Sequence, residues 1–176
     1  MRSGEIELGT DDLREVTRYA ARCAEGALEL FEAARPDDGR PSEALDAAWA
    51  FARGGERGKA LRDAAWAALR AAKEAPEPAA ADAARAAMAA AGAAYLHPLA
   101  DAHQVKHVLG SAAHAARAAE LAAGGDPAVA AARIDDARRL ATPALVEVLR
   151  RYPPAPGGGG RVGELVRTLD AALRSA

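Results

Sequence analysis

Apolar side chains recur along most of the chain at steps of three and four residues, the spacing that places them on one face of an α-helix. The pattern is clearest in segment 11–34, where one stripe is formed by Leu13, Val16, Ala20, Ala24, Ala27 and Phe31. Thr10 is the predicted N-cap of this helix, because a hydroxyl there can accept a hydrogen bond from the first turn. The sequence therefore predicts an amphipathic helix near the start of the chain.

Proline and glycine interrupt this pattern repeatedly and divide the chain into helices. Proline is tolerated in the first turn of a helix, and glycine is common after the last. Seven further helices are predicted to begin near residues 41, 58, 78, 99, 127, 143 and 161. Together they predict an all-α fold, a single-domain bundle of about eight helices over residues 1–176. Residues 1–10 are expected to be extended or disordered, and residues 153–160 to form a Pro/Gly loop.

Alanine dominates the composition, with 52 of the 176 residues, whereas aromatic residues make up only 4%. This predicts closely packed helices around a thin core, in which Trp49 and Trp66 are expected to be buried anchors. The segment "DAAWA" occurs at 46–50 and again at 63–67. The repeat has two interpretations, a stack of helical hairpins or a chance match in an alanine-rich chain.

Charge, cysteine content and the N-terminal pattern indicate which partners and which cellular compartment to expect. The 23 basic residues are balanced by 25 acidic ones, so the basic surplus that nucleic-acid binding requires is missing. Segment 79–96 contains Asp82 and Arg85, which argues against a membrane span. The single Cys23 cannot form an internal disulfide and is expected to be buried. Because the N-terminal residues also lack the pattern of a secretory signal, a cytoplasmic location is expected.

All four histidines fall within residues 97–114, and three of them share one face of the predicted fifth helix. His103, His107 and His114 lie within about 40° on a helical wheel, and Lys106 flanks them. The opposite face is apolar, with Val105, Val108, Leu109 and Ala112. The favoured interpretation is ordinary helix–helix contact, with the imidazoles bonded to backbone or carboxylates. The other is a partner-binding surface, for which His103, His107, His114 and Lys106 are the candidate residues. Because imidazoles titrate near neutral pH, affinity for a partner held there is expected to vary between about pH 5 and 8.

The same histidines also allow a metal site. His103 and His107 are four residues apart and could bind one zinc ion, with His97 or Asp101 as a further ligand. The segment "HQVKH" lacks the glutamate of the H-E-x-x-H motif, and neither a G-x-S-x-G elbow nor a P-loop occurs. His97 precedes Pro98, which predicts a break between two helices at this point. A metal-assisted hydrolase using His103 and His107 is the alternative function, whereas the main interpretation assigns no catalytic residue, metal or cofactor.

Two stretches, "DDGRPSEALDAAWAFARG" and "YLHPLADAHQVKHVLGSAAHAARAAEL", resemble a bacterial family of small helical immunity proteins, the immunity-five-like group. The resemblance extends from about residue 10 to residue 174, and members have also been labelled exonuclease subunits. It implies an all-α, cytoplasmic, non-enzymatic protein that neutralises a toxin by binding it. It implies a protein partner, no cofactor and no catalytic residues, and it leaves the oligomeric state open.

Overall fold

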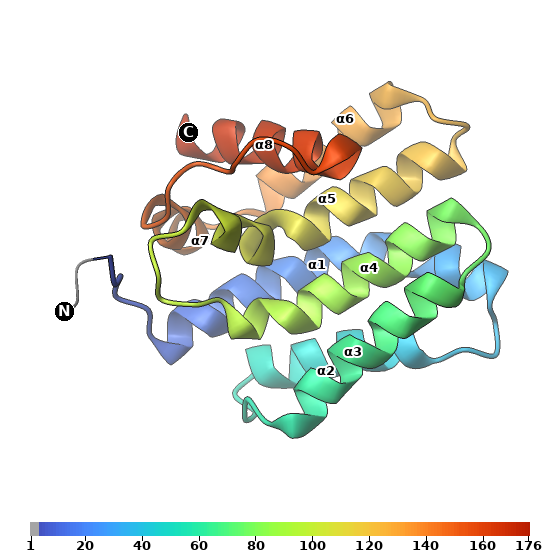
Figure 1. Cartoon of the computed structure of the whole chain (residues 1–176), viewed down its shortest axis with the longest axis horizontal. Helices are drawn as coiled ribbons and strands as arrows, with labels where there is room; N and C mark the ends of the chain where they lie inside the picture. Colours follow the sequence, from blue (N-terminus) through green and yellow to red (C-terminus); the bar gives the residue numbers. More distant parts are fainter. Residues whose placement is uncertain (1–3) are drawn as a thin grey trace.

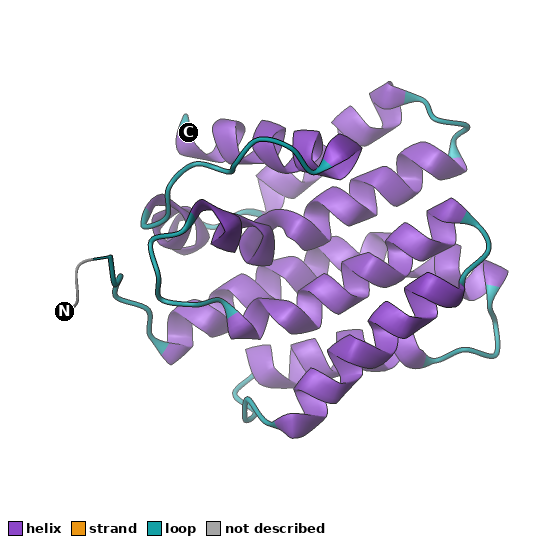
Figure 2. Cartoon of the chain, in the orientation of Figure 1, coloured by secondary structure: helices purple, strands orange, loops and turns teal. Residues whose placement is uncertain are grey.

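The computed structural model describes residues 4–176, and most of these residues belong to helices (Figures 1 and 2). The α-helices and the two short 3₁₀ helices, η1 and η2, are α1 (Thr10–Ala34), α2 (Arg40–Ala52), α3 (Lys59–Glu74), α4 (Pro78–Gly92), η1 (Ala93–Tyr95), η2 (Ala102–Gln104), α5 (Val105–Ala122), α6 (Pro127–Leu140), α7 (Pro143–Arg150) and α8 (Gly160–Arg174). The predicted all-α bundle of eight α-helices is confirmed. Gly9 rather than Thr10 is the N-cap of α1, because the carboxylate of Asp12 accepts a hydrogen bond from the Gly9 backbone nitrogen at 2.9 Å.

The centre of the bundle is α4, an alanine-rich helix that contacts α1, α2, α3 and α5 (Figure 1). Its buried alanines are Ala80, Ala81, Ala83, Ala84, Ala86, Ala87, Ala90 and Ala91. Because methyl side chains let helix axes approach closely, four neighbours fit around this one helix. In a stack of hairpins each unit contacts only its neighbours, so the arrangement is a bundle around a central helix. Over residues 4–176, no helix is both long and apolar enough to cross a membrane.

Bulky side chains fill the core away from the tryptophans. Phe31, Leu109, Leu149 and Tyr152 are almost completely buried. Trp66 is 57% exposed, so its predicted burial is wrong. The buried side of α3 is formed by Leu61, Ala68, Ala71 and Ala72, and the Trp66 ring lies on the outer side of the helix.

Trp49 is only partly buried, so the prediction of a core anchor holds only in part. Its ring packs against the main core cluster. Its indole nitrogen donates a hydrogen bond to Glu25 at 2.6 Å, and the Arg53 guanidinium lies 4.8 Å from the ring centroid. Trp49 therefore closes the edge of the α1–α2 contact instead of filling the interior.

The predicted break at His97-Pro98 is present, but α5 begins later than residue 99. After η1 the chain is extended and lies against the N-terminal segment, where the backbone nitrogen of Ile6 donates to the Pro98 carbonyl at 3.1 Å. Glu5 and Leu99 form an isolated antiparallel bridge. This pairing holds residues 98–101 out of a helical conformation. Residues 5–9 are likewise outside any helix, and residues 1–3 of the predicted extended segment lie outside the described residues.

Candidate functional site

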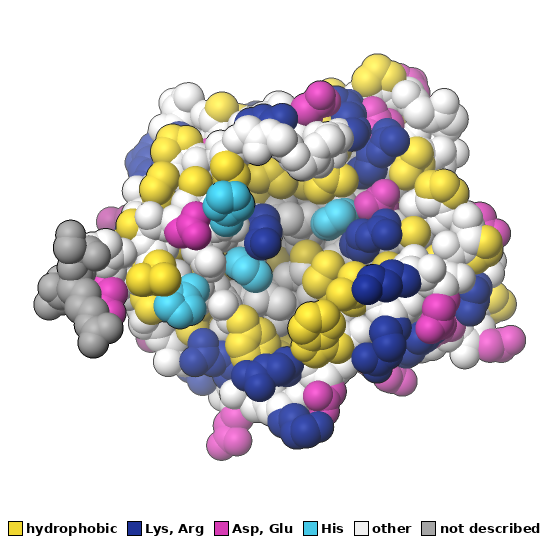
Figure 3. Space-filling model, viewed as in Figure 1, with side chains coloured by type: hydrophobic (Ala, Val, Ile, Leu, Met, Phe, Trp, Pro, Cys, Tyr) yellow, Lys and Arg dark blue, Asp and Glu magenta, His cyan; other side chains and the backbone are white. Residues whose placement is uncertain are grey.

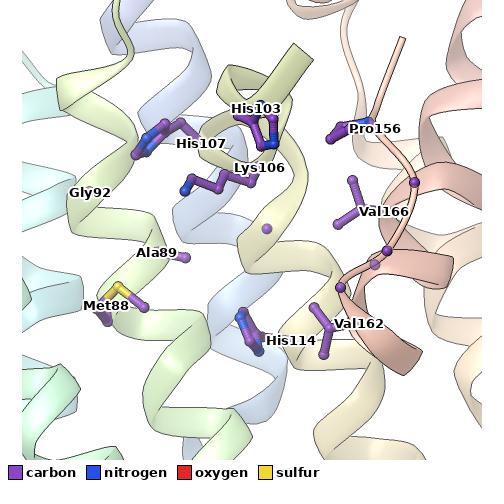
Figure 4. A pocket seen from close by; sticks show the side chains of 15 residues that line it. Met88, Ala89, Gly92, His103, Lys106, His107, His114, Pro156, Val162 and Val166 are labelled. Atoms are coloured by element: carbon purple, nitrogen blue, oxygen red, sulfur yellow. The ribbon is translucent and has the colours of Figure 1, made fainter. Parts of the chain in front are cut away.

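A pocket of about 550 Å³ lies between α4, α5 and the segment that leads into α8. Figure 4 shows side chains from all three elements around it, and Figure 3 shows the histidines gathered around a hollow on one face of the molecule. Its lining consists of Met88, Ala89, Gly92, His103, Lys106, His107, Gly110, His114, Pro156, Gly157, Gly158, Gly159, Val162, Gly163 and Val166. A pocket of this size, largely apolar with a few polar groups, is typical of a ligand-binding or partner-binding site.

The four candidate residues from the sequence all line this pocket. His103, His107, His114 and Lys106 project from one side of α5 and its preceding turn. The opposite side of α5 is buried as expected, with Val105, Val108, Leu109 and Ala112 in the core. His97 does not line the pocket. The histidine face therefore borders a cavity whose far wall is formed by the C-terminal segment. The sequence pattern of α5 does not predict this wall.

Two of the three imidazoles are oriented by a carboxylate. Nδ1 of His114 lies 2.8 Å from the carboxylate of Asp82, which is 9% exposed on α4. Nδ1 of His103 lies 3.0 Å from Asp101, which also accepts a hydrogen bond from the His103 backbone nitrogen at 2.9 Å. That backbone bond, followed by the imidazole, lowers the pKa of Asp101. Because a carboxylate only accepts, each Nδ1 carries a proton and each ring presents Nε2 as its remaining polar atom.

His107 and Lys106 have no such partner. Neither side chain forms a hydrogen bond or ion pair with the part of the chain that the structure describes. Burial lowers the pKa of His107, and the neighbouring positive charge of Lys106 lowers it further. In Figure 4 the Lys106 side chain extends from α5 into the space near the His107 ring. The charge of Lys106 helps to lower the pKa of Asp101, but the two side chains form no ion pair. The pocket therefore contains an ammonium group that forms no hydrogen bond or ion pair with a described residue.

Glycines allow the segment before α8 to form the far wall. Gly158, Gly159 and Gly160 all have positive φ angles, a conformation that other residues adopt only with strain. A side chain at Gly163 would overlap the carbonyl oxygen of Gly158. Arg167 then secures the turn, because its Nη1 donates to Gly158 O at 2.6 Å and to Pro156 O at 3.2 Å. The loop is therefore held close over the first turn of α8.

A buried ion pair fixes the start of α8 to α5. Glu120 is only 2% exposed, and its carboxylate accepts hydrogen bonds from Arg161 at 2.8 Å and from Arg117 at 2.7 Å. The Arg161 guanidinium is the main cause of the lowered pKa of Glu120. Each wall of the pocket is thus attached to the next by named bonds, and the pocket is preformed.

The titratable side chains among the described residues that line the pocket are three imidazoles and one ammonium group. Among those described, none is a serine, threonine, cysteine, aspartate or glutamate. No group of three or more His, Cys, Asp or Glu side chains within residues 4–176 is placed to hold a metal ion, so the metal alternative gains no support from the geometry. Cys23 is buried elsewhere, as predicted, and burial raises the pKa of its thiol to about 12.

Comparisons with known proteins agree with the resemblance in the sequence. No curated protein and no solved structure matches the chain. A family model described as "Imm-5 like putative immunity protein" matches residues 7–143. The matched range includes α4, α5 and all four histidines, and it ends before the loop and helix that form the far wall of the pocket. The chain therefore belongs to the Imm-5 like immunity protein family.

Proposed function

We propose that this protein is a cytoplasmic immunity protein that neutralises a toxin by binding it directly, without catalysing a reaction. The match to an immunity family over residues 7–143 carries this proposal. The described lining residues place no hydroxyl, thiol or carboxylate beside the imidazoles, which supports binding rather than chemistry at the pocket. Direct binding needs only a complementary surface, and the pocket supplies a preformed one.

We further propose that the pocket face contacts the toxin. His103 and Lys106 are exposed at this surface, whereas His107 and His114 are partly buried within it. Apolar side chains surround these polar groups, the combination found at the energetically important centre of many interfaces. On the face drawn in Figure 3, Lys and Arg side chains lie around the histidines.

The test uses a candidate toxin, chosen as the product of a toxin gene adjacent to the gene for this protein. Co-expression should restore the growth of cells that produce the toxin, and the two purified proteins should form a stable complex by isothermal titration calorimetry. Reversing the charge with Lys106→Glu should weaken the complex at least tenfold, or about 1.4 kcal/mol. Lys73→Glu, at another exposed position on α3 outside the pocket, should leave it unchanged.

Two results would contradict different parts of this proposal. A toxin that neither binds nor is neutralised would remove the immunity function for that partner. A toxin that binds equally well to both variants would retain the immunity function and move the contact surface away from the pocket.

A further inference from the structure

We infer that the pocket accepts an acidic side chain of the partner protein, carried on an apolar stretch of its chain. The juxtaposition that carries this inference is an unpaired lysine beside three imidazoles in a pocket with no acidic lining residue among those described. It deepens the proposed function, and rests on it only for the partner being a protein.

The balance of charge at the pocket differs from that of the whole chain. The protein has a formal net charge of −2, yet the only charged or titratable side chains of the pocket lining are Lys106, His103, His107 and His114. The nearest carboxylates are not part of the pocket lining: Asp82 is buried and paired with Nδ1 of His114, and Asp101 is about half exposed and paired with Nδ1 of His103. An anion inside the pocket would therefore contact Lys106 and the imidazoles and no carboxylate of the lining.

Lys106 is the strongest single feature of the site. An ammonium group has three donors and no acceptor, and this one has no partner within the described residues. Nearby arginines, by contrast, are ion-paired. Arg161 and Arg117 both pair with Glu120, and Arg85 lies 3.8 Å from Asp82. A carboxylate from a partner would supply the acceptor that Lys106 lacks.

The remaining lining of the pocket is apolar, so it favours apolar partner residues on either side of that carboxylate. Met88 and Ala89 of α4 face Val162 and Val166 of α8 across the cavity, with Pro156 at the loop. A small inorganic anion would leave this surface in contact with water. A glutamate side chain flanked by leucines would bury it, and the apolar area removed from water would add to the attraction between charges.

The N-terminus of α8 reinforces the preference for a negative group. The loop glycines and the first turn of α8 border the pocket, and the amino end of a helix carries a partial positive charge. It acts in the same direction as Lys106.

A matched pair of short peptides tests the inference on the intact protein. Acetyl-Leu-Glu-Leu-amide and acetyl-Leu-Gln-Leu-amide differ by one charge and hardly in shape. Binding is followed by the NMR shifts of the imidazole Cε1 protons of His107 and His114. The glutamate peptide should bind with a dissociation constant in about the millimolar range, and the glutamine peptide about tenfold more weakly. Lys106→Met should remove this difference, whereas Lys73→Met, outside the pocket, should keep it.

Equal affinities for the two peptides would overturn the inference, as would an unchanged preference in Lys106→Met or no binding of the glutamate peptide. These outcomes are separate from the fate of the immunity proposal. If the toxin is bound and neutralised but the peptide pair shows no preference, only the ligand chemistry is wrong. If the peptides behave as expected but no toxin is neutralised, the pocket chemistry stands and the immunity function does not.

Discussion

Nδ1 of His114 on α5 lies 2.8 Å from the carboxylate of Asp82 on α4, which connects the two helices that form adjacent walls of the pocket. Asp82 is almost completely buried, so removal of its carboxylate leaves a partly buried imidazole without its partner. Asp82→Ala should lower the free energy of unfolding by roughly 1–3 kcal/mol. Chemical denaturation measures this, with Asp46→Ala on the exposed side of α2 as the matched control. Equal stabilities of the two variants would show that the pair contributes nothing.

The loop wall of the pocket depends on glycine at position 163. A methyl group there would overlap the Gly158 carbonyl oxygen, so Gly163→Ala should displace the loop and cost roughly 1–3 kcal/mol of stability. It should also weaken binding of the glutamate peptide. The control is Gly26→Ala in the exposed middle of α1, where added atoms meet nothing within 4 Å. That change should stabilise the protein by roughly 0.5–1 kcal/mol. A stabilised Gly163→Ala variant would contradict the close approach of loop and helix.

The lowered pKa of His107 should make the folded protein less stable as the pH falls below about 6.5. Burial and Lys106 lower the pKa of His107 in the folded state, whereas in the unfolded chain it returns to about 6.5. Below that value the unfolded state binds the proton more readily, so the contribution of His107 is fully present above about pH 6.5 and is lost as the pH falls through the folded pKa.

His107→Gln removes this contribution. The difference in unfolding free energy between the parent and His107→Gln should be constant above about pH 7 and should shift against the parent as the pH approaches 5. Urea denaturation across this range measures it, and subtraction cancels the effects of the other titrating groups. A difference that favours the parent more strongly at low pH would mean that the folded state raises the pKa.

The two tryptophans should behave differently from each other and from a true core residue. Trp66 is mostly exposed, so Trp66→Ala should cost less than about 1 kcal/mol. Trp49 is partly buried and bonded to Glu25, so Trp49→Ala should cost roughly 1–3 kcal/mol. Phe31→Ala, at a fully buried position, should cost roughly 3–5 kcal/mol. Thermal or chemical unfolding of the three variants ranks them, and a large loss for Trp66→Ala would contradict its exposed position.

The sequence by itself determined the helices and one side of the pocket. Pro41, Pro78, Pro127 and Pro143 each lie in the first turn of a helix, as their fixed φ angle and missing N–H require. The helical spacing of apolar and polar residues in α5 predicted that Val108 and Leu109 lie in the core and that the histidines lie away from it. These features depend on residues within one or two turns, and local stereochemistry decides them.

Tertiary structure alone decided what the histidines face. His114 meets Asp82, which is 32 residues away, and Val162 and Val166 arrive from the far end of the chain. In alanine-rich helices a methyl group packs acceptably on almost any side, so the pattern of α4 does not say which neighbours it takes. The same ambiguity misplaced Trp66. Its alanine-rich surroundings predicted a buried ring, but the buried side of α3 is formed by Leu61, Ala68, Ala71 and Ala72. Where alanine lies on every side of a helix, the local pattern does not mark the side that faces the core, and only the packing of neighbouring helices decides it.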